Sequence, residues 1–419
     1  MRTALLRSLC CLFIASSAFA ETPARWWKGN LHTHSFWSDG DDYPEMIAAW
    51  YAENGYHFLA LSDHNILADH ERWIDIAKSR GGGKAFDKYL ARFGTPWVES
   101  RETNGVREVR LKMLSEFRGR LEQPGAFLMI QAEEITDSYI KVPIHMGGIN
   151  VREVIPPQSG SSVVEVMQRN LDAIAAQRAR TGVPMFGHIN HPNFKWAITA
   201  EELAQVDGER FFEVYNGHPG TFTDGDALHA STDRIWDVML TARLGSLGKP
   251  VVFGIGTDDS HNYHDGASKA ASRPGRGWVM VRAEALTPEK IVAAMEAGDF
   301  YASSGVTLKD VRRDARGLAV EIAAEPGVTY TTEFFGTRKG YDPKGEVVVG
   351  KEGETVRTTR RYRPGIGAVL AQVTGASASY AFQGDELYVR ARVTSSKTKT
   401  NPSAEGEVER AWTQPALPR

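Results

Sequence analysis

The sequence predicts an α/β fold built on a mainly parallel sheet. Apolar runs alternate with amphipathic stretches along residues 30–304, as they do where strands alternate with helices. Runs such as "FLAL" and "PVVFGIG" are apolar without interruption, which is typical of parallel strands covered on both faces. A chain of 419 residues exceeds one average domain and is long enough for a barrel with an appended domain.

The elements follow from this pattern in order. Strands are expected at residues 30–34, 56–65, 126–136 and 142–151, and then in "VPMFGHINHP", "RFFEVYNG", "PVVFGIGTDDSH" and "GWVMVRAE". A turn and helix over residues 38–54 carries Pro44 in its first turn, and a long amphipathic helix ends at Gly182 as C-cap. Another helix is expected around residues 226–247. The last one, "TPEKIVAAMEAGD", has Thr287 as N-cap and Pro288 at the first helical position.

The first twenty residues predict export. Arg2 and Arg7 precede an apolar run, and "AFA" follows as a small-x-small cleavage site. We expect residues 1–20 to be a signal peptide and the protein to be periplasmic or secreted, the alternative being an uncleaved anchor. Cys10 and Cys11 leave with the signal, so a metal in the mature chain must be held by His, Asp and Glu.

Charge gives no case for nucleic-acid binding. Without the two leader arginines, 47 of the 49 basic residues remain against 52 acidic ones, a net charge near −5. After signal cleavage no membrane partner is expected. The expected partner is therefore a small-molecule substrate, and the sequence leaves the oligomeric state open.

Polar residues gather where the apolar runs end. "NLHTHSFWSDG" opens the series with two histidines that alternate along a strand and so point to one face. The later ends are "SDH", "EEIT", the histidine of "PIHMG", "HINHP" and "DDSH". Because carboxyl ends of parallel strands converge on one rim of a βα barrel, this pattern predicts a metal cluster.

These motifs resemble the PHP (polymerase and histidinol phosphatase) superfamily of metallohydrolases over about residues 30–304. The resemblance implies a distorted seven-stranded βα barrel over residues 21–304 and two to three divalent transition metals (Zn, Mn or Fe). The ligands it implies are His32, His34, Asp39, His64, Glu134, His145, His191, Asp259 and His261. "DDSHN", "EVYNGHP" and "AWTQP" further resemble an exported branch that includes carbamate and aryl-ester hydrolases.

Alternatives remain at three of these positions. Glu134 fits the "E-I-T" register better than Glu133, and alternation puts Ala132 and Thr136 on its face. The D-x-H spacing selects Asp259 and leaves Asp258 behind it. His188 is the alternative to His191, whose following proline supplies the "HP" pair.

The chemistry expected from such ligands is hydrolysis. Metals that share a carboxylate and a water lower the water's pKa from ~16 to about 7, and a hydroxide bridging a di- or trinuclear site then attacks phosphorus or an acyl carbon. Glu134 is the expected bridge and, with Asp259 and His218, a catalytic residue. His218 would contact substrate or protonate the leaving group, unless it is merely solvated in a turn. Asp63 would orient an imidazole or cap a turn.

A phosphoesterase is the favoured function. A carbamate or carboxylic ester hydrolase using the same site is the alternative, and a non-catalytic binding protein is the remote one. Phosphoesters would favour cations at the mouth, for which Lys141, Arg273 and Arg276 are candidates by position.

Two further regions are expected outside the strands and helices of the barrel. An insertion over residues 66–125 would lie over the rim, with a hairpin at Asn104-Gly105 and with Trp73, Phe86, Tyr89 and Trp97 lining the mouth or forming a local core. Residues 305–419 would form a small β-rich appendage.

Overall fold

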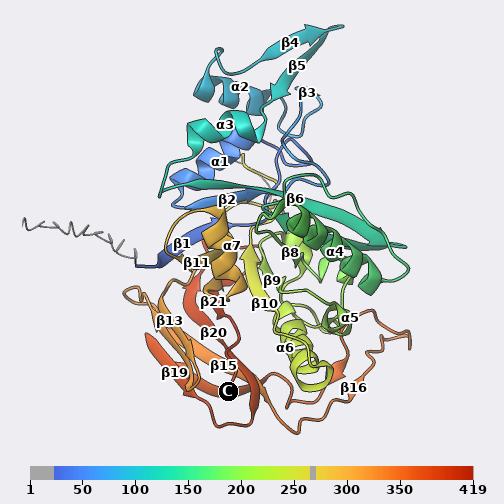
Figure 1. Cartoon of the computed structure of the whole chain (residues 1–419), viewed down its shortest axis with the longest axis vertical. Coiled ribbons are helices and arrows are strands. Elements are labelled where there is room, and N and C mark those ends of the chain that lie inside the picture. Colours follow the sequence, from blue (N-terminus) through green and yellow to red (C-terminus); the bar gives the residue numbers. More distant parts are fainter. Residues whose placement is uncertain (1–22, 265–269, 419) are drawn as a thin grey trace, which may run out of the picture.

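The computed structural model describes residues 23–264 and 270–418, and Figure 1 traces the chain through them. The expected signal peptide lies outside the described residues. None of the described helices is both long and apolar enough to cross a lipid bilayer. The fold is a mixed α/β arrangement around one large sheet.

That sheet has 13 strands. In spatial order they are β10 (Phe253–Thr257), β9 (Phe211–Asn216), β8 (Phe186–Ile189), β7 (Val142–Ile149), β6 (Leu128–Tyr139), β2 (Phe58–Leu61), β1 (Arg25–Asn30), β11 (Trp278–Ala283), β12 (Phe300–Ser303), β21 (Val408–Thr413), β20 (Glu386–Thr398), β15 (Tyr330–Arg338) and β18 (Ala368–Thr374).

The seven strands from β10 to β1 are mostly parallel, as predicted, with one exception that the sequence expectation missed. β1/β2, β2/β6, β8/β9 and β9/β10 pair parallel, whereas β6/β7 and β7/β8 pair antiparallel. Only Ile140 and Lys141 separate β6 from β7. A parallel pair needs a crossover of a dozen residues or more, so this two-residue link dictates a hairpin.

The segments that follow β1 and β10, the two outer strands of this run of seven, lie against each other. Thr33, just after β1, forms a parallel bridge with Ser260, just after β10. The amide of His34 donates to the Ser260 carbonyl at 3.0 Å, and that of Asp259 donates to the His32 carbonyl at 3.0 Å. The residues that follow the first and the last strand are thereby held side by side.

Helices cover the outside of the sheet as the capping signals predict. The α-helices outside the insertion are α1 (Pro44–Glu53), α4 (Val163–Thr181), α5 (Ala200–Gln205), α6 (Thr232–Ala242) and α7 (Pro288–Glu296). Gly182 adopts the left-handed conformation that ends α4, and the Thr287 side chain caps α7 with Pro288 at its first position. Short helical turns lie at Phe194–Trp196, Pro219–Thr221 and Arg243–Leu247.

The insertion forms a separate layer at the top of Figure 1. It contains β3 (Arg72–Asp75), α2 (Gly82–Phe93), β4 (Ser100–Thr103), β5 (Val106–Leu111) and α3 (Leu114–Leu121), with β3-β5-β4 as a small sheet. The β4–β5 hairpin turns at Asn104 and Gly105, both at positive φ, as predicted.

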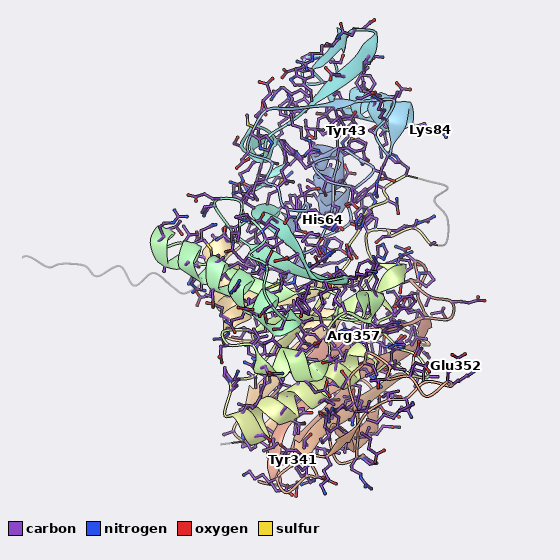
Figure 2. All side chains as sticks on the ribbon, turned by 90° about the vertical axis from the view of Figure 1, so that its right-hand side faces the viewer. Tyr43, His64, Lys84, Tyr341, Glu352 and Arg357 are labelled. Atoms are coloured by element: carbon purple, nitrogen blue, oxygen red, sulfur yellow. The ribbon has the colours of Figure 1, made fainter. Side chains whose placement is uncertain are left out.

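The aromatic residues of this layer mainly form its own core. Phe86 and Tyr89 are buried, and the Tyr89 ring stacks on Tyr43 at 4.0 Å. Trp97 packs against the same cluster. Figure 2 labels Tyr43 and Lys84 in the upper part of the molecule, with His64 below them.

The C-terminal residues extend the main sheet and form two smaller ones. β13 (Leu308–Asp314), β14 (Gly317–Ile322) and β19 (Ser377–Ala381) form a three-stranded sheet, and β16 (Gly345–Glu346) pairs with β17 (Arg361–Tyr362). β21 pairs with β12, so the hydrogen-bonded sheet runs on across residue 304. A domain boundary there stays a prediction.

An apolar core lies beneath the polar strand ends. Phe58, Ile130, Phe211 and Phe253 are buried in one cluster of side chains from neighbouring strands. Along β6 the same face continues from Ile130 through Ala132 to Glu134, because strand side chains alternate. The polar cluster is therefore built directly on a packed apolar floor.

Candidate metal centre

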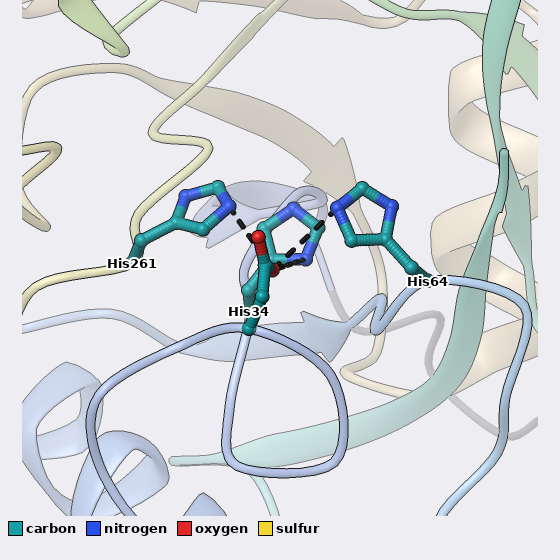
Figure 3. Close-up of side chains that lie close together, drawn as sticks. His34, His64 and His261 are labelled. Atoms are coloured by element: carbon teal, nitrogen blue, oxygen red, sulfur yellow. Dashed lines mark ion pairs between the residues drawn. The ribbon is translucent and has the colours of Figure 1, made fainter. Parts of the chain in front are cut away.

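Nine histidine and carboxylate side chains converge at the strand ends. Their ligand atoms form four groups, each within 4.8 Å: His34, Asp39, His64 and His261; His32, His34 and Glu134; His32, His191 and Asp259; and His64, Glu134 and His145. All nine residues predicted as ligands lie in these groups. Figure 3 shows three of them, His34, His64 and His261, turned toward one point from separate segments of the chain.

The spacing around Glu134 is that of ligands sharing ions. Glu134 Oε1 lies 3.3 Å from His32 Nε2 and 3.2 Å from both His145 Nδ1 and His191 Nε2. Two ligand atoms each about 2.1 Å from a tetrahedral ion lie roughly 3.4 Å apart. All three separations are close to that edge and longer than the usual N–H···O distance of about 2.9–3.0 Å.

Asp259 has similar spacings to the imidazoles of His32 and His34. Its Oδ1 lies 3.3 Å from His32 Nε2 and 3.2 Å from His34 Nε2. His34 Nε2 also lies 3.4 Å from Glu134 Oε2. The two carboxylates therefore flank the same pair of imidazoles.

The donor atoms fit bound divalent metals. His32 Nε2, His34 Nε2 and Glu134 Oε2 are buried without a hydrogen-bond partner, which is costly unless something else binds them. Burial alone would raise the pKa values of Glu134 and Asp259, but the surrounding imidazoles, His32 foremost, hold both pKa values well below their usual range. Burial, aided by His261, lowers the pKa of His34 to about 3. Burial would lower the pKa values of His32, His191 and His261, but the neighbouring carboxylates raise them, so a bound metal would displace protons from these imidazoles.

A hydrogen-bonding layer beneath the ligands includes Glu213, which the sequence analysis missed. Glu213 is fully buried in β9 and contacts His32 Nδ1 at 2.7 Å through Oε1. It also accepts hydrogen bonds from the His191 amide at 2.7 Å and from Thr257 Oγ1 at 2.7 Å. The sequence did contain a signal for Glu213, which is the only charged residue inside the apolar part of "RFFEVYNG". Because side chains alternate along a strand, Glu213 lies on the same inward face as Phe211.

A bulge in β9 then brings Asn216 to the same face. The pairing of β9 with β10 shifts register between Ile255 and Gly256, skipping one residue of β9. Asn216 Nδ2 can therefore donate to Glu213 Oε2 at 2.8 Å and to Asp259 Oδ2 at 3.1 Å. Bulges commonly re-aim side chains beside functional sites.

Asp63 has neither of the two roles expected of it. Its Oδ1 accepts from the Ser35 amide at 2.8 Å and from Ser38 Oγ at 2.6 Å, and its Oδ2 accepts from Ser35 Oγ at 2.7 Å. It thus fixes the loop between His34 and Asp39 in place. The His64 ring is instead held through Nδ1 by Thr136 Oγ1 at 2.5 Å.

The two adjacent carboxylate pairs separate as strand geometry requires. Glu134 lies in the cluster, whereas Glu133 accepts from the Ile155 amide at 2.6 Å on the opposite face. Asp259 lies in the cluster at a strained φ of 48°, whereas Asp258 is enclosed by the amides of Gly275, Arg276 and Gly277. Strain of this kind concentrates at functional sites.

Two further histidines, His188 and His218, lie close to the cluster but belong to none of the four ligand groups. His188 lies outside all four; it is buried with both ring nitrogens unpartnered, and burial lowers its pKa to about 4. His218 also lies outside them, with its ring 5.6 Å from that of His261. Its Nδ1 accepts from the Gly220 amide at 2.9 Å, so a neutral ring carries its proton on Nε2, and burial lowers its pKa.

The insertion brings a cation to the cluster. Arg80 Nη2 lies 3.4 Å from Asp39 Oδ2, and its side chain is 58% exposed. Arg276, a candidate by sequence position, is buried and donates to the Gly217 and Ala271 carbonyls at 3.0 and 2.8 Å. Arg276 thus braces the loops behind the site.

No protein-family model and no curated protein matches this chain. Three solved structures resemble it: a two-domain protein from Bacteroides vulgatus containing a predicted PHP-like metal-dependent phosphoesterase (14% identity, TM-score 0.40, covering 93% of this chain and 95% of that one), a proposed metal-dependent phosphoesterase from Bifidobacterium adolescentis (12%, 0.28, 56% and 87%), and an amidohydrolase from Chromobacterium violaceum (16%, 0.16, 36% and 36%). Likenesses this distant assign no function to the chain.

Proposed function

We propose that this protein is a metal-dependent hydrolase and that its substrates are phosphoesters. The observation that carries the proposal is the convergence of nine histidine and carboxylate side chains, with buried nitrogen and oxygen atoms left without hydrogen bonds. Structural metal sites are saturated by about four ligands. A surplus of ligands around a shared carboxylate favours two to three ions, of zinc, manganese or iron, at a working site.

Each part of the cluster would hold one ion. One position would use His32, His191 and Asp259; a second would use His64, Glu134 and His145; a third would use His34, Asp39 and His261. Glu134 would be shared, because its two oxygens face different imidazoles. Ions bound there would supply an activated water and a Lewis acid for the ester oxygen.

The surrounding residues orient this machinery. Glu213 holds the Nδ1 proton of His32 at 2.7 Å, which leaves the Nε2 lone pair facing the cluster. Asn190 Nδ2 donates to Glu134 Oε1 at 2.7 Å and fixes the shared carboxylate. His218 presents an Nε2–H that can donate to a substrate oxygen, including that of the leaving group.

Arg80 favours phosphoesters over carboxylic or carbamic esters. A phosphomonoester brings two negative charges to the rim, whereas the other esters are neutral. A guanidinium can bind two phosphoryl oxygens at once, and Arg80 is exposed beside Asp39. The alternative, a carbamate or carboxylic ester hydrolase like those of the exported branch, would use the same ligands without needing this cation.

A substrate panel with two arginine variants tests the proposal. Metal-analysed enzyme is assayed with an aryl phosphate, a phosphodiester and an aryl acetate. Arg80→Met should raise KM for the aryl phosphate about tenfold and leave the aryl acetate unchanged. The matched control is Arg101→Met in the same insertion, where the arginine pairs with Glu108 at 2.7 Å. It should leave both substrates unchanged.

Two other outcomes would reassign the function. Turnover of the aryl acetate alone would favour the ester hydrolase. No turnover of any substrate by fully metal-loaded protein would favour a binding protein that keeps the site.

We further propose that the chain is a PHP superfamily member with a seven-stranded barrel and a C-terminal β-rich appendage. The order of its motifs and the Thr33–Ser260 bridge between the two ends of the strand run support this assignment. The leader sequence supports export. Protein purified from the periplasm or medium should then begin at Glu21.

A further inference from the structure

A cavity of about 150 Å³ lies beside the metal centre and is not used by the proposed chemistry. Two residues belong to both places. Asn216 lines the cavity and donates to Asp259 at 3.1 Å, and His218 lines it with its ring 5.6 Å from that of His261. A molecule bound at the metal centre can therefore extend past His218 into this space.

The C-terminal region builds one wall of the cavity. Ser403, Ala404 and Glu407 line it opposite the loop that follows β9. This wall is anchored, since Glu407 Oε1 accepts from Tyr215 OH at 2.7 Å and pairs with Lys399 Nζ at 3.1 Å. The space is thus enclosed by two segments nearly two hundred residues apart in sequence.

Phe222 forms another wall at a conformational cost. Its φ is 45°, which is rare for a bulky residue, yet its side chain is 51% exposed and so gains little from burial. Its ring stacks on Trp196 at 5.0 Å, and Trp196, itself at a φ of 54°, stacks on His229 at 3.8 Å. Backbone strain that is not offset by burial of the side chain points to a role in binding.

The charges around the cavity favour an uncharged occupant. Its two carboxylates are already paired, Asp224 with Arg410 at 2.5 Å and Glu407 with Lys399. None of its described lining residues is a lysine or an arginine. An anionic group would find no lysine or arginine among these lining residues, and a cation would compete with existing pairs.

We propose that this cavity is a subsite for the leaving group of the substrate and that it takes a neutral planar ring. A cavity of about 150 Å³ is the size that holds one benzene ring, and aromatic walls favour stacking of such a ring. The ester oxygen of an aryl substrate would then lie beside the Nε2–H of His218. This subsite rests on the proposed function, since it places the ring relative to an ester bound at the metal centre.

Two phosphonates that cannot be hydrolysed test the subsite without the influence of leaving-group chemistry. Binding of phenylphosphonate and methylphosphonate to metal-loaded protein is measured by calorimetry. Phenylphosphonate should bind at least about tenfold more tightly, as expected for burial and stacking of one ring. Ala404→Phe, at an exposed position, should fill the cavity and abolish that preference while leaving methylphosphonate affinity unchanged. Phe222→Ala should reduce the preference.

Ala315→Phe is the matched control, at an exposed turn between β13 and β14, and it should keep the wild-type preference. Equal affinities in the wild type, or a preference that survives Ala404→Phe, would overturn the subsite. If neither phosphonate binds, the phosphoester proposal fails. The subsite is then tested with phenyl and methyl carbamates, for which a tenfold preference lost in Ala404→Phe would support it and equal affinities would overturn it.

Discussion

Two clusters of buried charge in this protein are built in opposite ways. At the candidate metal centre, the carboxylates of Glu134 and Asp259 lie 2.9–3.4 Å from nitrogens of five imidazoles. At the junction of α6 and β20, the fully buried Arg390 pairs with Asp237 at 2.7 Å and with Asp233 at 2.8 Å. The first cluster balances its carboxylates with imidazoles, which can give up their protons to bound metal ions, whereas the second uses guanidinium groups, which cannot.

We therefore attribute a functional role to the first cluster and a structural role to the second. Arg390 and Asp237 join a helix of the N-terminal part to a strand of the C-terminal part, and Tyr388 OH adds a 2.9 Å hydrogen bond to Asp237. Burial would raise the pKa of Asp233, but Arg390 and Arg392 hold its pKa at about 2. Because opposite charges meet within the chain, this cluster needs no ligand.

The largest effect is expected at the shared carboxylate. Glu134→Gln should lower kcat/KM about a thousandfold and release metal, because an amide cannot bridge two cations as a carboxylate does. Glu133→Gln on the opposite face is the control and should retain metal and most activity. If the two variants behave the other way round, the strand face assigned to the site is wrong.

The junction should respond in stability and not in metal content. Arg390→Met removes the buried guanidinium that pairs with Asp233 and Asp237 and should lower the free energy of unfolding by about 3–5 kcal/mol. Arg312→Met removes a guanidinium that is 77% exposed and should change it by less than about 1 kcal/mol. Denaturant unfolding and metal analysis of both variants check this. Loss of metal in Arg390→Met would contradict the separation of the two clusters.

Glu213 should show the effect of orienting a ligand from behind. Glu213→Gln replaces one of the two acceptor oxygens by an NH₂ group, which cannot accept the hydrogen bonds that His32, His191 and Thr257 donate. Metal affinity should fall about 10- to 100-fold, with little change in the unfolding midpoint of the metal-loaded protein. Titration with a metal-sensitive dye measures this, and wild-type affinity would mean that His32 needs no such support.

Glu209 is a third case, a buried carboxylate with neither metal nor ion pair close to its oxygens. Burial raises its pKa from 4.5 to about 8, against smaller opposing effects of the Phe211 amide and Arg243. The folded state therefore keeps a proton that the unfolded state loses. The stability that this proton contributes is fully present below pH 4.5 and is lost as pH rises toward 8.

Glu209→Gln removes this titration and should shift Tm by a few degrees in a pH-dependent way. The Tm of the variant minus that of the wild type should increase from pH 5 to pH 8.5. Thermal unfolding across that range measures it, and a difference that does not change with pH would contradict the assignment.

The ligand-bearing residues could be predicted because the sequence carries motifs that resemble those of the PHP superfamily, and strand alternation helps to choose between neighbours. Strand alternation alone puts Glu134 and Ala132 on one face, and the D-x-H spacing separates Asp259 from Asp258. The caps of α4 and α7 are equally local, since Gly182 and Thr287 act within one turn.

What the sequence did not predict depends on distant partners. In the sequence Glu213 is a single charged residue in an apolar strand, and its partner His32 is distant along the chain and close only in the folded structure. The antiparallel β6–β7 hairpin was missed although its two-residue link requires it. Ser403 and Ala404 approach the loop after β9 only because β20 and β21 join the main sheet, which no local pattern announces.

Metal content tests the central claim most directly. The mature protein, purified without any chelator, is analysed for transition metals together with Glu134→Gln and Glu133→Gln. The account predicts two to three ions per chain in the wild type and in Glu133→Gln, and fewer in Glu134→Gln. One ion or none in the folded wild type would contradict it.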